Sequence, residues 1–133
     1  VRFLLADPAT KVTLNLSKLF LDDDTNLLNY NEAGRVQALD GLGNVVAETV
    51  FNANNGAGTR AVQLEHAAGF SAVVVTAGAY DNQGVFNFGA YVDDAGLFAT
   101  ASYAAGGTLH GSDFLIHNIE FELLVIGVNP GPI

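Results

Sequence analysis

Short segments in which apolar and polar residues alternate follow one another along most of the chain. In residues 11–16, Val12, Leu14 and Leu16 share one side of an extended chain, and residues 85–92 alternate in the same way. A period of two residues is typical of a β-strand with one buried face, whereas an amphipathic helix repeats every 3.6 residues. Turn-forming residues separate the segments at short intervals. The pattern therefore predicts an all-β protein.

The alternating segments define the predicted strands. They lie at residues 1–5, 11–16, 35–39, 45–51, 59–64, 70–76, 85–92, 97–103 and 113–128. Eight or nine short antiparallel strands joined by turns are typical of a β-sandwich, and we predict a single sandwich of jelly-roll type. One domain is expected to span residues 1–133, with its longest connection at 17–34 and a terminal tail at 129–133.

Glycine and proline mark the places where strands are expected to end. Residues 40–44 read Asp-Gly-Leu-Gly-Asn, and the two glycines can adopt positive φ, so a hairpin is predicted there. Asp7 and Pro8 are expected to break the first strand from the second, because proline has no N–H for a strand ladder.

The last predicted strand contains a change of face. Phe114 and Ile116 point to one side of it, whereas Ile119 and Phe121 have the opposite parity. A strand can change faces in this way only with an extra residue, so we predict a β-bulge at 117–118.

Charge is unevenly distributed along this acidic chain. The five basic residues all lie within the first 60 residues, and the net charge is −9. Nucleic acid binding needs clustered Lys and Arg, and anionic membranes repel an acidic protein, so neither partner is expected. No run of 18 apolar residues is present, and no membrane insertion is expected. Surplus carboxylates favour Ca²⁺ as a cofactor, although acidity can also serve solubility alone.

The residues that carry most catalytic chemistry are absent or wrongly spaced. The chain has no Cys, which excludes a disulfide framework, a thiolate zinc site and a cysteine nucleophile. His66, His110 and His117 do not form a metalloprotease motif, and neither a serine nucleophile elbow nor a phosphate-binding loop occurs. We therefore expect no enzymatic activity.

The best candidate for a metal site is the acidic run Asp22, Asp23 and Asp24. Asparagines and a glutamate follow it, and oxygen-rich loops of this kind can wrap Ca²⁺. The spacing does not fit an EF-hand, because Leu27 and Ala33 stand where a glycine and a glutamate are needed. The alternative interpretation is a solvated acidic loop.

A second set of polar and aromatic residues could bind a ligand. The set consists of Tyr80, Asp81, Asn82, Asp93, Asp94 and Tyr103. Tyrosine can stack on a sugar while the polar groups form hydrogen bonds. The chain has no Trp, however, and ordinary turns explain the same residues.

Three segments carry a resemblance to a known family. They are EAGRVQALDGLGNVVAETVF (residues 32–51), AGFSAVVVTAGAY (68–80) and GSDFLIHNIEFEL (111–123). In this order they resemble the jelly-roll β-sandwich modules of bacterial RTX-type surface adhesins exported by type I secretion, and related exported lectin-like domains. The resemblance implies an extracellular location at the bacterial cell surface, Ca²⁺ dependence and a role in adhesion. It also implies that Glu32 and Asp113 bind an ion or fix a loop.

Two functional hypotheses follow. The first is a structural module, an adhesin or filament subunit, that packs with copies of itself or with neighbouring modules through apolar terminal strands. The residues expected in that contact are Val1, Phe3, Leu5, Leu124 and Ile126. The alternative is a Ca²⁺-dependent lectin-like module that binds a glycan or a peptide.

Overall fold

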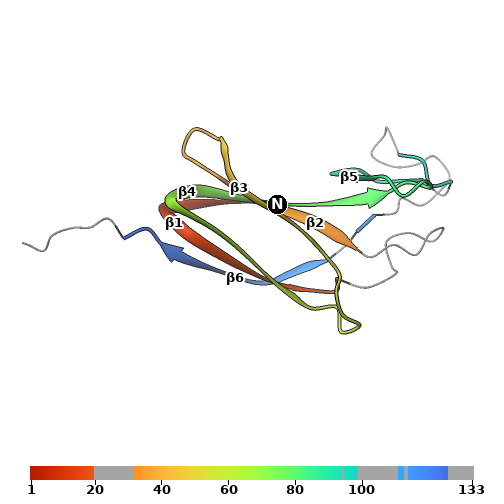
Figure 1. The fold of residues 1–133 in the computed structure, drawn as a ribbon, viewed down its shortest axis with the longest axis horizontal. Coiled ribbons are helices and arrows are strands. Elements are labelled where there is room, and N and C mark those ends of the chain that lie inside the picture. The colour runs from red at the N-terminus through yellow and green to blue at the C-terminus, as the bar shows by residue number, and fades with distance from the viewer. Residues whose placement is uncertain (20–31, 94, 99–110, 113, 126–133) are drawn as a thin grey trace, which may run out of the picture.

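The described part of the chain forms one antiparallel sheet. The computed structural model describes residues 1–19, 32–93, 95–98, 111–112 and 114–125, and it contains no helix within them. The strands are β1 (Arg2–Ser17), β2 (Ala33–Leu39), β3 (Val45–Asn52), β4 (Arg60–Tyr80), β5 (Phe86–Phe88) and β6 (Leu115–Leu123). Their order is β3-β2-β4-β1-β6, and β5 pairs with the end of β4 (Figure 1).

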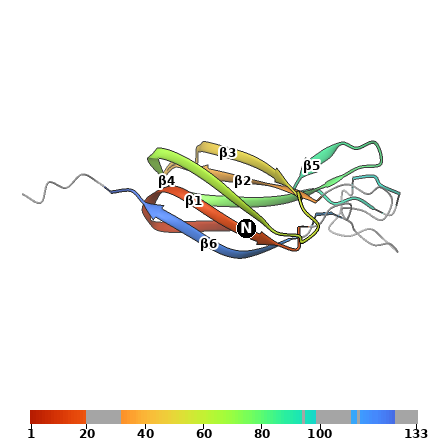
Figure 2. The ribbon, with the colours of Figure 1, turned by 60° about the horizontal axis from the view of Figure 1, so that its bottom comes forward.

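Two long strands, β1 and β4, carry the sheet and bend it. Residues 2–4 of β1 pair with residues 72–74 of β4, and residues 11–16 pair with residues 60–65. The register shifts between these two stretches, around Ala9 and Phe70. Gly69 adopts a φ of 93° at this corner, a conformation that costs glycine little. As a result, the sheet turns over, so that β6 faces the part that contains β2 and β3 (Figures 1 and 2).

The continuity of β1 and β4 corrects two predicted strand ends. Asp7 and Pro8 do not end a strand, because β1 runs through them from Arg2 to Ser17. The predicted strands at 59–64 and 70–76 are likewise parts of β4. Proline and glycine remove ladder bonds or permit unusual dihedrals, and here they produce a bend within a strand.

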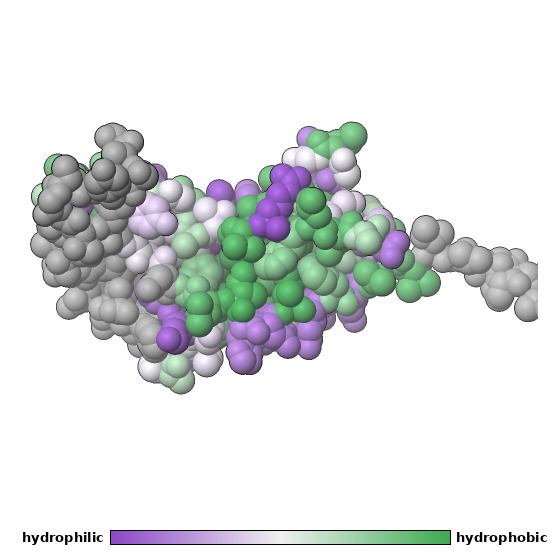
Figure 3. Space-filling view, turned by 180° about the vertical axis from the view of Figure 1, so that it is seen from behind, coloured by the Kyte–Doolittle hydropathy of each residue, from purple (hydrophilic) through white to green (hydrophobic). Residues whose placement is uncertain are grey.

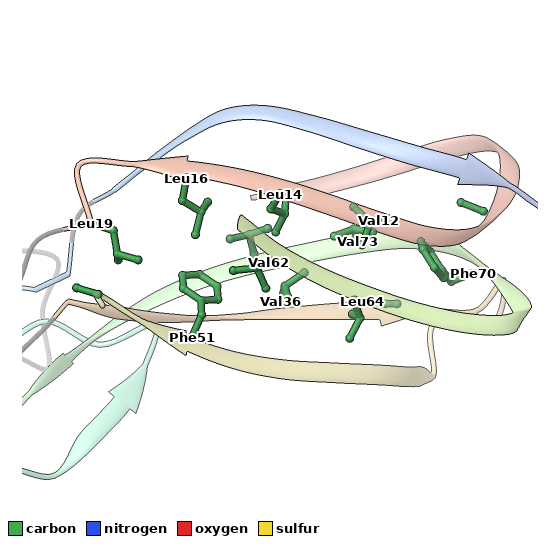
Figure 4. Close-up of a cluster of buried hydrophobic side chains, with 14 residues drawn as sticks. Val12, Leu14, Leu16, Leu19, Val36, Phe51, Val62, Leu64, Phe70 and Val73 are labelled. Atoms are coloured by element: carbon green, nitrogen blue, oxygen red, sulfur yellow. The ribbon is translucent and has the colours of Figure 1, made fainter. Parts of the chain in front are cut away.

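The predicted alternation is confirmed in the core. Val12, Leu14 and Leu16 are at most 2% exposed. From β1 they point towards Val36 of β2 and Phe51 of β3 across the interior of the bent sheet (Figure 4). Burial of these apolar faces is the main favourable term that holds the two parts of the sheet together. The all-β class is thus confirmed, and the described strands form one open sheet.

The hairpin predicted at residues 40–44 joins β2 to β3. The carboxylate of Asp40 accepts hydrogen bonds from the N–H groups of Leu42 and Asn44, each at 2.9 Å. The bond from the Asn44 backbone is the main reason why the pKa of Asp40 lies below its ordinary value of 3.8. The ionised carboxylate is therefore the form that holds this turn.

The predicted bulge in the last strand is also confirmed. Asn15 of β1 lies opposite Asn118, whereas the next residue, Leu16, lies opposite Ile116. His117 is the extra residue, and it is exposed. The bulge allows apolar residues on both sides of it to pack against the core.

The predicted strands after β4 are shorter in the structure. The segment at 85–92 contributes only β5, and Val92 makes an isolated bridge to Phe98. Gly84 and Gly89 flank β5 with φ of 83° and 75°. Positive φ at both positions turns the chain out of the ladder. The last strand ends at Leu123, and residues 99–110 and 126–133 lie outside the described residues.

Candidate functional site

Most of the predicted metal ligands lie outside the described residues. These are Asp22, Asp23, Asp24 and Asp113. Within the part of the chain that the structure describes, no group of three or more His, Cys, Asp or Glu residues could hold a metal ion. Glu32 is described, and it lies directly before β2 with 0% exposure.

The surroundings of Glu32 link two distant parts of the sequence. The carbonyl of Glu32 accepts a hydrogen bond from the N–H of Ala53 at 2.8 Å. The next residue, Ala33, donates its N–H to Oγ of Ser112 at 2.9 Å. Ser112 in turn donates its N–H to the carbonyl of Gly78 at 2.7 Å. The structure thereby joins the segment that carries Glu32 to the residue that precedes Asp113 in the sequence.

Burial makes Glu32 the most unusual carboxyl group among the described residues. The only buried polar or charged residues there are Glu32 and Ser112, at 0% and 7% exposure. A carboxylate removed from water is costly unless hydrogen bonds or a positive charge compensate it. Glu32 and Ser112 are 80 positions apart in the sequence, and the hydrogen bond from Ala33 to Ser112 links their segments, for which spacing in the sequence gives no signal.

The structure brings two of the predicted ligand-binding loops together. Asn82 donates its backbone N–H to the carbonyl of Gly96 at 2.7 Å and its side-chain amide to the carbonyl of Ala95 at 3.3 Å. The turn after β4 therefore lies against the turn at residues 93–97. Asp94 and Tyr103, which belong to the same predicted set, lie outside the described residues.

The acidic side chains of these loops hold their own turns. Asp81 accepts two backbone N–H bonds at 2.9 Å from residues of its own turn, and Asp93 accepts two at 2.9 and 3.0 Å. Tyr80 packs edge-on against Phe86, with ring centroids 4.7 Å apart. For Asp81 and Asp93, the contacts fit the interpretation as turn residues.

A polar hollow, for which the sequence gives no signal, lies between the end of β1 and the start of β4. Its volume is about 690 Å³, and it is lined by Asn15, Asn54, Arg60, His117 and neighbouring residues. Arg60 donates to the carbonyl of Asn52 at 2.7 Å. The side-chain amide of Asn15 donates to Asn118, and that of Asn55 donates to the carbonyl of Thr59, so several polar groups of this hollow are already hydrogen-bonded.

An apolar groove lies between the start of β1 and the start of β6. Its volume is about 480 Å³. It is lined by Val1, Phe3, Val75, Ala77, Ser112, Phe114, Leu115 and Ile116. The view from behind shows hydrophobic residues over the middle of this face, with hydrophilic residues along one border (Figure 3). The groove gives access to the interior between the two parts of the bent sheet.

The predicted self-association residues divide between two places. Val1 is 73% exposed, and it lines the groove together with the half-buried Phe3. Leu5 is half-buried against the core. Leu124 lies at the corner of the sheet, where its N–H bonds the carbonyl of Pro8 at 2.8 Å. Ile126 lies outside the described residues.

Comparison with protein-family models, with curated proteins and with solved structures finds no match for this chain. The likeness to adhesin modules therefore remains a prediction from the three sequence segments. The described residues include no helix that is long and apolar enough to cross a membrane.

Proposed function

We propose that this chain is a non-catalytic structural module of the bacterial cell surface, an adhesin or filament subunit that packs with copies of itself or with neighbouring modules. Its location would be extracellular, and its fold would be completed as a jelly-roll sandwich. The observation that carries the proposal is the open apolar groove between β1 and β6.

Exposed apolar side chains support an assembly role. At the groove, Val1 and Leu115 are 73% and 54% exposed, and Leu4 at the adjacent edge is 75% exposed. Leu123 and Val125 at the end of β6 are 55% and 86% exposed. Apolar residues gathered on strand edges favour contact with another protein chain.

The lectin-like alternative has less support. Its acidic residues Asp81 and Asp93 already accept backbone hydrogen bonds within their own turns. A ligand that used them would compete with those bonds. We therefore favour assembly over glycan or peptide recognition.

Assembly can be measured directly on the purified chain. Light scattering and negative-stain microscopy should find species larger than the 13.9 kDa monomer in Ca²⁺, and these should decrease on addition of EGTA. A strict monomer at high concentration in Ca²⁺ would contradict the proposal. If EGTA leaves the assembly unchanged, the proposed structural role stands, and the proposed calcium dependence is wrong.

Calcium stabilisation is the second part of the proposal, and Glu32 is its testable ligand. Ca²⁺ at 100 times its Kd adds about 2.7 kcal/mol to the stability of the folded state, which corresponds to a rise in Tm of roughly 10 °C. We expect Glu32→Gln to lose this rise in a thermal melt, because an amide supplies no charge to the ion. The matched control is Glu65→Gln, which changes an exposed glutamate of β4 in the same way and should keep the rise. If Ca²⁺ raises the Tm equally in Glu32→Gln and in the unmodified chain, Glu32 is not a calcium ligand.

A further inference from the structure

The start of β1 is an open strand edge. The terminal ammonium of Val1 donates to the carbonyl of Val75, and the N–H of Val75 donates back to Val1, both at 2.8 Å. In an antiparallel ladder such pairs alternate with residues that turn their N–H and C=O groups to the other side. Arg2 and Leu4 are those residues, because they lie opposite Val74 and Ala72 in the register. Among the described strands, only β4 pairs with the start of β1. The backbone N–H and C=O groups of Arg2 and Leu4 therefore point away from β4, to the outer edge of the sheet.

The strand β6 offers a second open edge beside the same groove. One side of β6 pairs with residues 9–17 of β1. On its other side, no strand within the described ranges pairs with it. Both edges border one apolar groove, and within the described residues neither has a strand partner on its outer side.

The side chains on the two edges are sorted in the same way. Phe3 and Leu5 of β1 are half-buried against the core, as are Ile116, Ile119 and Phe121 of β6. The residues that alternate with them are exposed. A strand placed beside either edge would thus continue an apolar inner face, and its outer face would lie beside exposed residues that include Leu4 as well as the charged Arg2 and Glu120.

The charges of the two outer faces are complementary. Arg2 is exposed on the β1 edge, and Glu120 and Glu122 are exposed on β6. Charges of opposite sign on adjacent strands stabilise their pairing, whereas like charges oppose it. A second copy of this chain would bring both kinds of edge to the groove.

The strand directions suit a symmetric pair of chains. β6 is antiparallel to the later part of β1, and β1 turns over at the corner, so the start of β1 and β6 run in the same direction (Figures 1 and 2). A two-fold axis that lies in the open face and runs along the strands exchanges the positions of the two edges, keeps their direction and turns the two grooves towards each other. The start of β1 in one copy then lies parallel to β6 of the other, at two equivalent places.

We propose that a second copy of this chain closes the groove as a two-fold dimer, in which the edge at residues 2–5 of each copy pairs with β6 of the other. The two apolar grooves are buried against each other, and Arg2 of one copy lies beside Glu120 or Glu122 of its partner. This inference rests on the proposed self-assembly, and it names the surface and the partner for it.

Charge reversal tests the pairing without altering the core. Arg2→Glu should weaken the dimer at least tenfold at low salt, measured by analytical ultracentrifugation, because it places like charges side by side. Arg2→Glu combined with Glu120→Arg should recover the dimer. Lys18→Glu is the matched control, since it reverses an exposed positive charge beyond the end of β1 and should leave the dimer unchanged.

Cysteine trapping tests the same contact by an independent readout. The chain has no Cys of its own, so any disulfide that forms must join the two introduced cysteines and shows that they lie close together. Under mild oxidation, Arg2→Cys with Glu120→Cys, or with Glu122→Cys, should give a covalent dimer on denaturing gels. Arg2→Cys with Glu65→Cys is the control, because Glu65 lies on β4 away from the groove, and it should stay monomeric.

The outcomes separate this inference from the proposed function. The pairing is supported if Arg2→Glu abolishes the dimer and the double charge reversal restores it. It is further supported if a disulfide forms between position 2 of one copy and position 120 or 122 of the other. Assemblies that persist in Arg2→Glu and form no such disulfide would overturn the pairing and leave self-assembly in place. A chain that stays monomeric at high concentration in Ca²⁺ would overturn both.

Discussion

Leu14→Ala is expected to reduce the free energy of unfolding by about 2–5 kcal/mol, the range for truncating a buried leucine. Leu14 is 0% exposed, and it lies on β1 opposite Val62 of β4 and Ile119 of β6. The side chain is therefore enclosed within its own layer and by the opposite part of the bent sheet. Loss of its methyl groups leaves a cavity that three paired strands cannot close. Urea unfolding followed by circular dichroism measures the change, provided that the slope with urea stays constant.

The control for Leu14 is the same substitution at Leu42. Leu42 is 88% exposed at the tip of the β2–β3 hairpin. Leu42→Ala should change the free energy of unfolding by no more than about 0.5 kcal/mol, as is usual for exposed positions. Equal effects at the two positions would show that the interior of the bent sheet is not the core of this protein.

Gly78→Ala is expected to detach β5 from the end of β4. Gly78 lies opposite Phe88, and a Cβ at this position would overlap the carbonyl oxygen of Asn87 and lie 2.7 Å from Cζ of Phe86. The Phe86 ring can rotate, but the Asn87 carbonyl belongs to the paired backbone and cannot move without breaking the ladder. Overpacking of this kind costs about 1–3 kcal/mol or more. Faster hydrogen exchange at the N–H of Gly89, which bonds Ala77 at 2.7 Å, would report the detachment.

The effect at Gly78 can be separated from the general effect of replacing a glycine. Gly56 lies in the loop before β4, and a Cβ there meets no atom within 4 Å. Gly56→Ala should leave exchange at Gly89 unchanged. If Gly78→Ala also leaves it unchanged, the close approach of β5 to β4 is not present in solution.

Several local features could be predicted from the sequence because neighbouring residues determine them. The alternation of Val12, Leu14 and Leu16 follows from the two-residue period of a strand, and burial of that face needs no knowledge of its partner. The bulge at His117 follows from a change of parity within one strand. Asp40 holds the predicted hairpin with hydrogen bonds to its own turn.

The continuity of β1 and β4 could not be predicted in the same way. Pro8 and Gly69 carry the same local signals in a bend as in a turn between strands. The ladders on both sides of the corner determine which of the two forms. These ladders join residues that are 44 to 72 positions apart, from Leu16 and Arg60 to Arg2 and Val74.

The candidate site depends even more on distant pairing. Glu32 was singled out by a resemblance, but its complete burial and the bond from Ala33 to Ser112 connect positions 79 residues apart. For Asp81 and Asp93 the sequence allowed either a ligand-binding role or ordinary turns, and in the structure their carboxylates accept hydrogen bonds within their own turns.

The sequence by itself determined that this protein is all-β, which faces of its strands are apolar, and where the chain makes a hairpin and a bulge. Each of these depends on dihedral preferences and on side-chain parity over a few residues. Only the tertiary structure decided that β1 and β4 bend as continuous strands and that the start of β1 and β6 border one open apolar groove. The physical reason is that strand order comes from hydrogen bonds and burial between segments far apart in the chain, and local pattern does not encode which edges find a partner.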